Sequence, residues 1–261
     1  MKPAAFLLFF LLSSPLHTVA GSHSDIDVVL FGDSNTWLGG DSCCNPKGWS
    51  KWFVEAFGPK SCVSYARSGA TWTNTVKTKY DITEYAEVIT DNNVIFNQIN
   101  RFADAVGRHV QPVPGLIIVM AGTNDAWFDS RRPGVWKTNF EMAFSDSIGI
   151  PEVSVCTSLA SSVVLACKKL REIAPAAKIV LATPMQTSRT DMSKISRAAD
   201  IIAECGDKMD IMVIRLDREG CVKAGAEKKS QKFTYDGVHT NTEGARRIGY
   251  FLSQRITNGI F

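Results

Sequence analysis

The sequence has little net charge. Its 29 Lys and Arg residues stand against 26 Asp and Glu residues, which gives +3 with histidine counted neutral. If residues 1–20 are cleaved, as argued below, one Lys is lost and the balance becomes 28 against 26, or +2. So small a charge gives no reason to expect nucleic acid as a partner. The sequence also lacks internal repeats and low-complexity stretches, and 261 residues suit one domain that folds unaided.

Signatures of metal binding are also scarce. Beyond residue 20 only His23, His109 and His239 remain, and no two cysteines have Cys-x-x-Cys spacing, so we expect no metal and no cofactor. Seven cysteines is an odd number, so at least one is free or pairs between chains. Cys43 and Cys44 could anchor disulfides in an exporting compartment, whereas Cys167 has the apolar neighbours of a core residue. The sequence leaves the pairing open.

The N-terminus has the pattern of a cleavable export signal. Residues 1–20 begin with a charged Lys2, continue through the apolar run 6–12, and end on Thr18-Val19-Ala20. The apolar run is shorter than the roughly 20 residues that a membrane-spanning helix needs, so we expect no stable membrane insertion. We predict a signal peptide at 1–20, a single domain at 21–261, and a secreted or periplasmic protein. The oligomeric state stays open.

The rest of the chain alternates between strand and helix patterns. Apolar runs predict strands at residues 26–31, 62–66, 115–120, 178–183 and 211–216. Helical spacing predicts helices at residues 48–57, 95–106, 156–173, 193–205 and 242–256. This alternation predicts a doubly wound α/β sandwich with a parallel sheet. The segment 127–151 is long for a connection between strand and helix, and such loops are often functional.

A serine follows the first predicted strand. Gly32-Asp33-Ser34 leaves this strand at its carboxyl end, where open α/β sheets bind ligands, so Ser34 is a candidate nucleophile. Such a nucleophile needs a base, and His239 is the best candidate by elimination. Asp236 stands three residues before it, close enough on one loop to orient the imidazole. Asp236 could equally begin a turn before Gly237.

Two further residues could stabilise an oxyanion. Gly69 follows the second predicted strand and would offer a backbone N–H, Asn124 follows the third and would offer a side-chain amide, and the Ser34 N–H would be a third donor. Gly69 could instead serve only a tight turn, and Asn124 could only cap a helix.

Four blocks together carry a resemblance. Gly-Asp-Ser near the mature N-terminus, Ser-Gly-Ala after the second strand, Gly-x-Asn-Asp after the third and Asp-x-x-His near the C-terminus resemble the SGNH, or GDSL, hydrolase family. The resemblance spans residues 26–261. It implies a flavodoxin-like three-layer α/β/α sandwich with a five-stranded parallel sheet, and an esterase that uses no cofactor.

By this resemblance Ser34 is the nucleophile, His239 the base, Asp236 its partner, and Gly69 and Asn124 are oxyanion donors. At residue 35 the family pattern expects Leu, but this chain has Asn. The difference could alter the packing beside the nucleophile. The Gly-x-Ser-x-Gly elbow is absent at Ser34, which argues against the α/β-hydrolase fold.

Tryptophans in the strand-exit loops indicate the substrate. Trp37, Trp72, Trp127 and Trp136 lie among polar residues, and flat aromatic faces among polar groups suit sugar rings. We therefore predict an exported serine esterase that hydrolyses short-acyl esters, in particular O-acetyl esters of carbohydrates. One alternative is a lipase or lysophospholipase of the same fold. A second is a non-catalytic carbohydrate-binding relative. A third is a metal-dependent phosphoesterase built from Asp33, Asp125, Asp236 and His239.

Overall fold

A five-stranded parallel sheet forms the centre of the protein. The computed structural model describes residues 23–85, 88–144 and 150–261. The strands β1 (Asp27–Gly32), β2 (Ser61–Ser64), β3 (Leu116–Met120), β4 (Lys178–Ala182) and β5 (Met212–Ile214) lie in the order β2-β1-β3-β4-β5, and all neighbours are parallel. This order confirms the predicted flavodoxin-like sheet.

The central strands are buried on both faces, as their continuous apolar runs predict. Every residue of β3 is buried, and in β1 Val29 and Phe31 pack on one face while Val28 and Leu30 pack on the other. The register pairs Phe31 with Val119 and Gly32 with Met120. β1 and β3 therefore end side by side, and the segments that follow them leave the sheet together.

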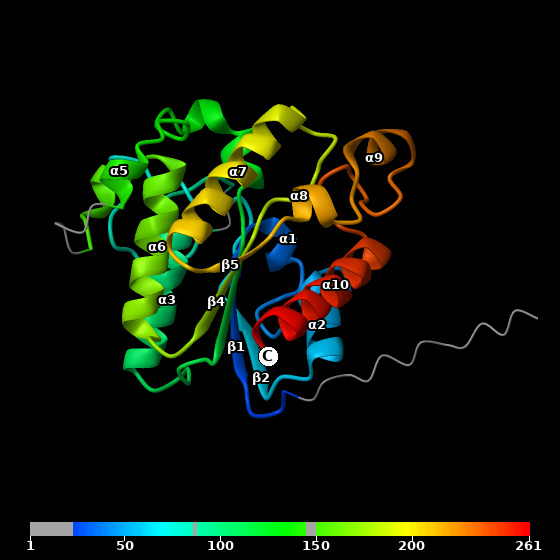
Figure 1. The fold of residues 1–261 in the computed structure, drawn as a ribbon, viewed down its shortest axis with the longest axis horizontal. Coiled ribbons are helices and arrows are strands. Elements are labelled where there is room, and N and C mark those ends of the chain that lie inside the picture. Colours follow the sequence, from blue (N-terminus) through cyan, green and yellow to red (C-terminus); the bar gives the residue numbers. More distant parts are fainter. Residues whose placement is uncertain (1–22, 86–87, 145–149) are drawn as a thin grey trace, which may run out of the picture.

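Helices cover both faces of the sheet (Figure 1). On one face lie α2 (Trp49–Phe57) and α10 (Thr242–Ile260). On the other lie α3 (Ile95–Gly107), α6 (Leu159–Ile173) and α7 (Met192–Lys208). These five helices match the predicted ones closely. The predicted start of α6 at residue 156 is wrong by three residues, because Ser158 and Ser161 form a capping box that begins the helix at Leu159.

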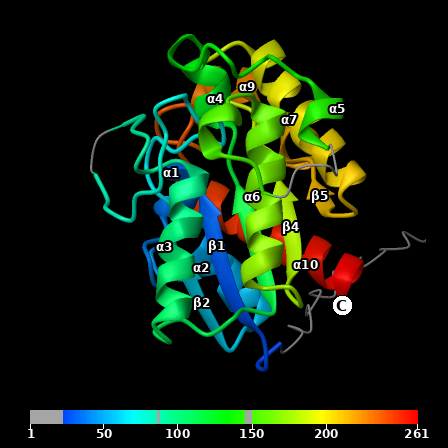
Figure 2. The same cartoon turned by 90° about the vertical axis from the view of Figure 1, so that its left-hand side faces the viewer.

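Short helices lie near the carboxyl ends of the strands and were not predicted. They include α1 (Ser34–Trp37) and α4 (Thr123–Trp127), which directly follow β1 and β3, together with α8 (Leu216–Glu219) and α9 (Ala224–Ser230). Residues 127–151, predicted as a long loop, contain the 3-10 helix η1 (Asp129–Arg131) and α5 (Phe140–Ala143), and the 3-10 helix η2 (Val153–Val155) follows. Figure 2 shows α1, α4 and α9 toward the same end of the sheet. Ser34 and Asn124 thus lie on short helices that directly follow β1 and β3.

The predicted signal peptide at 1–20 lies outside the described residues, so it stays a prediction. Among the helices that the structure describes, none is long and apolar enough to span a membrane. Cys167 is fully buried, as predicted, and the Sγ atoms of Cys43 and Cys62 lie 3.3 Å apart.

Candidate active site

Ser34 begins a helix immediately after β1. Gln98 holds the end of the strand, because its Nε2 donates to the Gly32 carbonyl at 2.9 Å and its Oε1 accepts the Gly32 N–H at 3.0 Å. Asp33 is the N-cap of α1, and its carboxylate accepts the Asn35 N–H at 3.0 Å. This change from strand to helix places Ser34 at a helix N-terminus. Its side chain lies at the carboxyl edge of the sheet, where 8% of the residue is exposed.

Ser34, His239 and Asp236 form a hydrogen-bonded chain although 202 residues separate Ser34 from Asp236 in the sequence. His239 Nε2 lies 2.9 Å from Ser34 Oγ, and His239 Nδ1 lies 2.6 Å from Asp236 Oδ2. The other carboxylate oxygen of Asp236 accepts the backbone N–H groups of Val238 and His239. The structure therefore brings all three predicted residues together in the order that a base and its orienting carboxylate require.

The hydrogen bonds that Asp236 accepts favour its ionised form. Partial burial opposes its ionisation, but the hydrogen bonds from the His239 ring and from two backbone N–H groups outweigh burial and hold the pKa of Asp236 below its ordinary value. An ionised Asp236 can accept the Nδ1–H of His239, which leaves Nε2 free to accept a proton from Ser34.

A buried glutamate holds the loop that carries His239. Glu227 on α9 is 1% exposed, and its carboxylate accepts the backbone N–H groups of Phe233 and Thr234 as well as the Thr234 hydroxyl. On the other side, the Thr187 hydroxyl donates to the Gly237 carbonyl at 2.7 Å. Neither residue was predicted, since a Glu and a Thr outside the motifs carry no signal in the sequence that sets them apart.

Each of the three predicted oxyanion donors keeps an N–H bond with no acceptor among the described residues. In the part of the chain that the structure describes, neither the Ser34 N–H nor the Gly69 N–H donates to a protein acceptor. The Asn124 amide donates to the Ala70 carbonyl at 2.9 Å, which uses one of its two N–H bonds. Gly69 has φ +72°, and a Cβ there would lie 2.7 Å from the Ile89 nitrogen, so only glycine fits. Free donors at three strand exits can stabilise negative charge on a substrate oxygen.

Asp125, next to Asn124, fixes the segment after Gly69. Its buried carboxylate accepts the backbone N–H groups of Trp72 and Thr73, at 3.0 and 2.9 Å, and the Thr73 hydroxyl at 2.6 Å. Together Asn124 and Asp125 tie the exit of β3 to the segment that follows β2. The Gly-x-Asn-Asp block thus fixes the segment after Gly69 and supplies one of the predicted oxyanion donors.

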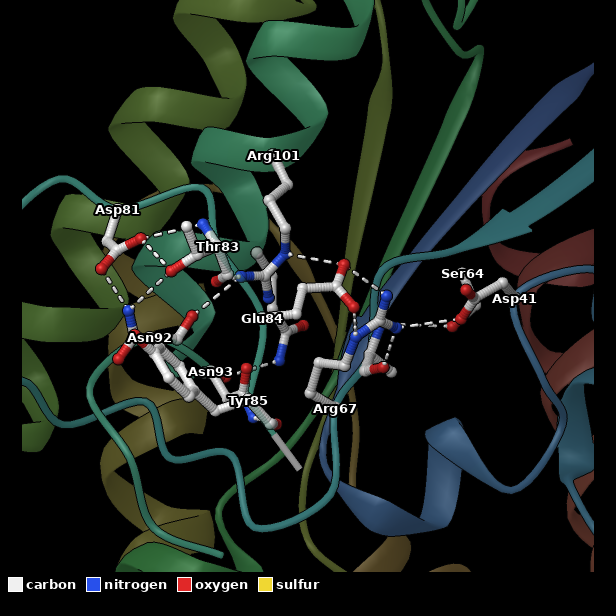
Figure 3. A network of polar contacts seen from close by, with 12 residues as sticks. Asp41, Ser64, Arg67, Asp81, Thr83, Glu84, Tyr85, Asn92, Asn93 and Arg101 are labelled. Carbon is white, nitrogen blue, oxygen red and sulfur yellow. Dashed lines mark hydrogen bonds and ion pairs between the residues drawn. The ribbon is translucent and has the colours of Figure 1, made fainter. Parts of the chain in front are cut away.

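An ion-pair network centred on Arg67 and Glu84 holds the segment that leads into the Gly69 turn (Figure 3). Arg67, two residues before Gly69, donates to both oxygens of Glu84 at 2.7 and 2.6 Å and to Asp41 at 2.9 Å. Arg101 on α3 approaches the same Glu84 carboxylate at 3.4 Å and donates to the carbonyl of Thr83. The network attaches the Gly69 turn to α3 and to the loop after α1. No local pattern predicts this network, because its members are scattered between Asp41 and Arg101.

Asp33 carries an unfavourable buried charge beside the site. Burial raises its pKa from 3.8 to about 6, although the Asn35 N–H, the Thr123 hydroxyl and the charge of His239 act in the opposite direction. Between these two pH values the unfolded chain ionises at Asp33 while the folded protein keeps the proton. The free energy of unfolding therefore falls as the pH rises through this window.

We expect Asp33→Asn to stabilise the protein at neutral pH and much less in acid. One pH unit of difference in pKa corresponds to about 1.4 kcal/mol, so the gain should approach about 3 kcal/mol at pH 7.5 and nearly vanish at pH 4. The amide can still accept the Asn35 N–H. Urea unfolding at both pH values measures the gain, with the exposed Asp25→Asn as the control. A gain of equal size at both pH values would contradict the assigned pKa.

The tryptophans divide into exposed and buried positions. Trp37, at the end of α1, is 45% exposed, and Trp127, at the end of α4, is half-buried. Trp136 is half-buried and packs against the core, where its Nε1 donates to Asp129 at 3.1 Å. The predicted substrate contact of Trp72 is wrong for this conformation, because the residue is 1% exposed and packs in the core. A tryptophan after a strand can fill either a loop or a core, and sequence alone does not separate the two.

The four residues of the phosphoesterase alternative do not form a metal site. Within residues 23–85, 88–144 and 150–261, no three His, Cys, Asp or Glu side chains converge so that they could hold a metal ion. The Asp125 carboxylate is occupied by three donors from Trp72 and Thr73, and Asp236 by His239 and the backbone. These contacts leave the two carboxylates committed to positioning the chain.

Comparison with known families identifies the family of this chain. Residues 30–247 match the GDSL-like lipase/acylhydrolase family. The chain belongs to this family. Its members hydrolyse esters, so the protein is an ester-hydrolysing enzyme with the SGNH hydrolase fold. At Asn35, where the family pattern has Leu, the side-chain oxygen accepts the Thr240 N–H at 3.3 Å, so this departure links α1 to the loop that carries His239.

Solved structures show the same fold at low sequence identity. A possible lipase from Chitinophaga pinensis is 18% identical with a TM-score of 0.58, and the alignment covers 89% of this chain and 98% of that one. A lipase/acylhydrolase from Enterococcus faecalis is 16% identical with a TM-score of 0.52, covering 89% and 96%. The acetyl xylan esterase AlAXEase is 18% identical with a TM-score of 0.53, covering 90% and 100%. No curated protein matches the chain by sequence.

Proposed function

We propose that the protein is an exported serine esterase that removes short acyl groups, in particular O-acetyl groups, from carbohydrates. The observation that carries the serine mechanism is the chain from Ser34 Oγ through His239 to Asp236, with separations of 2.9 and 2.6 Å. In acylation Ser34 Oγ attacks the ester carbonyl carbon while its proton passes to His239 Nε2. Negative charge then develops on the carbonyl oxygen, and in this proposal the Ser34, Gly69 and Asn124 N–H groups donate to it.

The same groups complete the reaction. The sugar oxygen leaves with the proton from His239 Nε2, and acetyl remains bonded to Ser34. A water molecule next gives a proton to Nε2 and attacks the acetyl carbon. The bond to Ser34 breaks, acetate leaves, and Ser34 Oγ takes the proton back. The reaction needs no oxidant and no further reactant.

The substrate and the location rest on other observations. Export is supported by the signal-like pattern of residues 1–20, and a sugar substrate by the exposed ring of Trp37 and the half-buried ring of Trp127 near the ends of β1 and β3. AlAXEase, a neighbour in fold, is by its description an acetyl xylan esterase. At 18% identity this supports a sugar ester as the first substrate to test.

A panel of esters that varies acyl length and alcohol separately tests the proposal. We expect kcat/KM on acetyl esters to exceed that on octanoyl esters by at least about tenfold, and acetate to be released from an acetylated xylo-oligosaccharide. A long acyl chain gains about 0.8 kcal/mol for each CH₂ group that apolar surface buries, and we expect this site to lack such a surface. Preference for octanoyl esters without activity on acetylated sugars would identify a lipase instead. Failure to hydrolyse any ester would favour the non-catalytic relative.

A further inference from the structure

Two arginines enclose a pair of stacked aromatic rings at the end of α4. The rings of Trp127 and Phe128 stack with centroids 5.0 Å apart and planes 19° apart. The Arg189 guanidinium lies over the Trp127 ring at 5.9 Å, and the Arg131 guanidinium over the Phe128 ring at 5.7 Å. Both separations are within the range of cation–π attraction. We call Arg189, Trp127, Phe128 and Arg131 the aromatic–arginine platform.

The two guanidinium groups of the platform are unpaired. In the described part of the chain, neither Arg131 nor Arg189 has a carboxylate within ion-pair distance, and both residues are exposed. The nearest acids in the sequence are committed elsewhere: Asp129 pairs with Lys194, and the Asp191 side chain accepts the Ser193 N–H. The platform therefore presents two positive charges that no carboxylate of the described residues neutralises.

The platform adjoins the candidate active site at two places, through Trp127 and through Arg189. Trp127 follows Asn124 by three residues, or about one helical turn, on α4. Arg189 packs against the turn that carries the acid and base: a Cβ on Gly237 would lie 3.4 Å from Arg189 Cδ, and the Ser188 N–H donates to the Gly237 carbonyl at 2.9 Å. The platform thus adjoins an oxyanion donor on one side and the His239 loop on the other.

We propose that the platform binds an acidic sugar, so that the preferred substrates are acetyl esters of carboxylate-bearing glycans. A planar guanidinium binds a carboxylate with two parallel hydrogen bonds, and the stacked rings offer flat apolar faces to the sugar. Because Arg189 is already held over Trp127, its side chain loses less conformational entropy on binding than that of a fully solvated arginine. The inference rests on the proposed function, because it concerns the alcohol part of the same ester.

Matched sugar esters test the role of Arg189. The wild-type protein is assayed on an acetylated methyl glucuronoside and on the same acetylated methyl glucoside, which differs only in lacking the carboxylate. We expect kcat/KM to be about tenfold higher on the uronoside, mainly through KM, and this preference to shrink as salt is added. Arg189→Gln should reduce the ratio of the two kcat/KM values to near one.

Arg197 provides a matched control. Its guanidinium also lies over a tryptophan, Trp136, at 4.9 Å, and it donates to the Trp136 carbonyl. Arg197→Gln should keep both rates and the wild-type preference. Equal kcat/KM on the two sugars, or an equal change of the preference in both variants, would overturn the inference.

Two further substrates separate this inference from others. An acetyl ester of glycerol phosphate offers a phosphate in place of the carboxylate, and a stronger preference for it than for the uronoside would overturn the acidic sugar. Turnover of a neutral activated acetate reports on the esterase itself. If wild type hydrolyses that acetate through Ser34 but does not prefer the uronoside, only the present inference fails. If Ser34→Ala hydrolyses it equally well, the proposed function fails.

Discussion

Replacing Ser34 by alanine is expected to lower kcat for an activated acetyl ester by roughly 10⁵-fold to 10⁶-fold, because the attacking oxygen is removed. The residue is small, and among the described residues its Oγ forms a hydrogen bond only with His239. The fold should therefore persist. Steady-state kinetics measures the loss, and circular dichroism and thermal unfolding check the fold. The exposed Ser42, in the loop after α1, supplies the control Ser42→Ala, which should turn over at the wild-type rate. Turnover near the wild-type rate in folded Ser34→Ala would contradict the mechanism.

Replacing His239 by alanine should cost about as much as replacing Ser34. In the proposed mechanism the two residues act as a unit, so the double variant Ser34→Ala/His239→Ala should be no slower than Ser34→Ala, although independent residues would multiply their losses. His109, exposed at the end of α3, offers the control His109→Asn, since asparagine tolerates the left-handed backbone there (φ 58°). A double variant that is slower than Ser34→Ala by a further hundredfold or more would show that His239 contributes by a separate route.

Much of the fold was predictable because it depends on local patterns. The run Leu116–Met120 predicts a strand that is buried on both faces, and β3 is one. Parallel strands end at the same edge of a sheet, so a serine after the first strand and an asparagine after the third had to lie close together. The contact between Ser34 and His239 followed from chemistry, since few histidines were available as a base.

The contacts that support these residues were not predictable from the sequence. Gln98 at the end of β1, Glu227 beneath the His239 loop and the Arg67–Glu84 pair all act between segments far apart in the chain. Nothing in their local sequence distinguishes them from surface residues of the same type. The burial of Trp72 depends likewise on tertiary packing in a core cluster built from distant segments, which no periodicity in its own loop predicts.

Covalent labelling with a fluorophosphonate, followed by mass spectrometry of the peptides, tests most directly whether Ser34 is an activated nucleophile. An unactivated serine does not react at a useful rate, whereas one that loses its proton to a neighbouring base does. We expect one adduct per chain, on the peptide that contains Ser34, absent in Ser34→Ala and formed far more slowly in His239→Ala. An adduct on another serine, or no adduct on a preparation that hydrolyses esters, would contradict it.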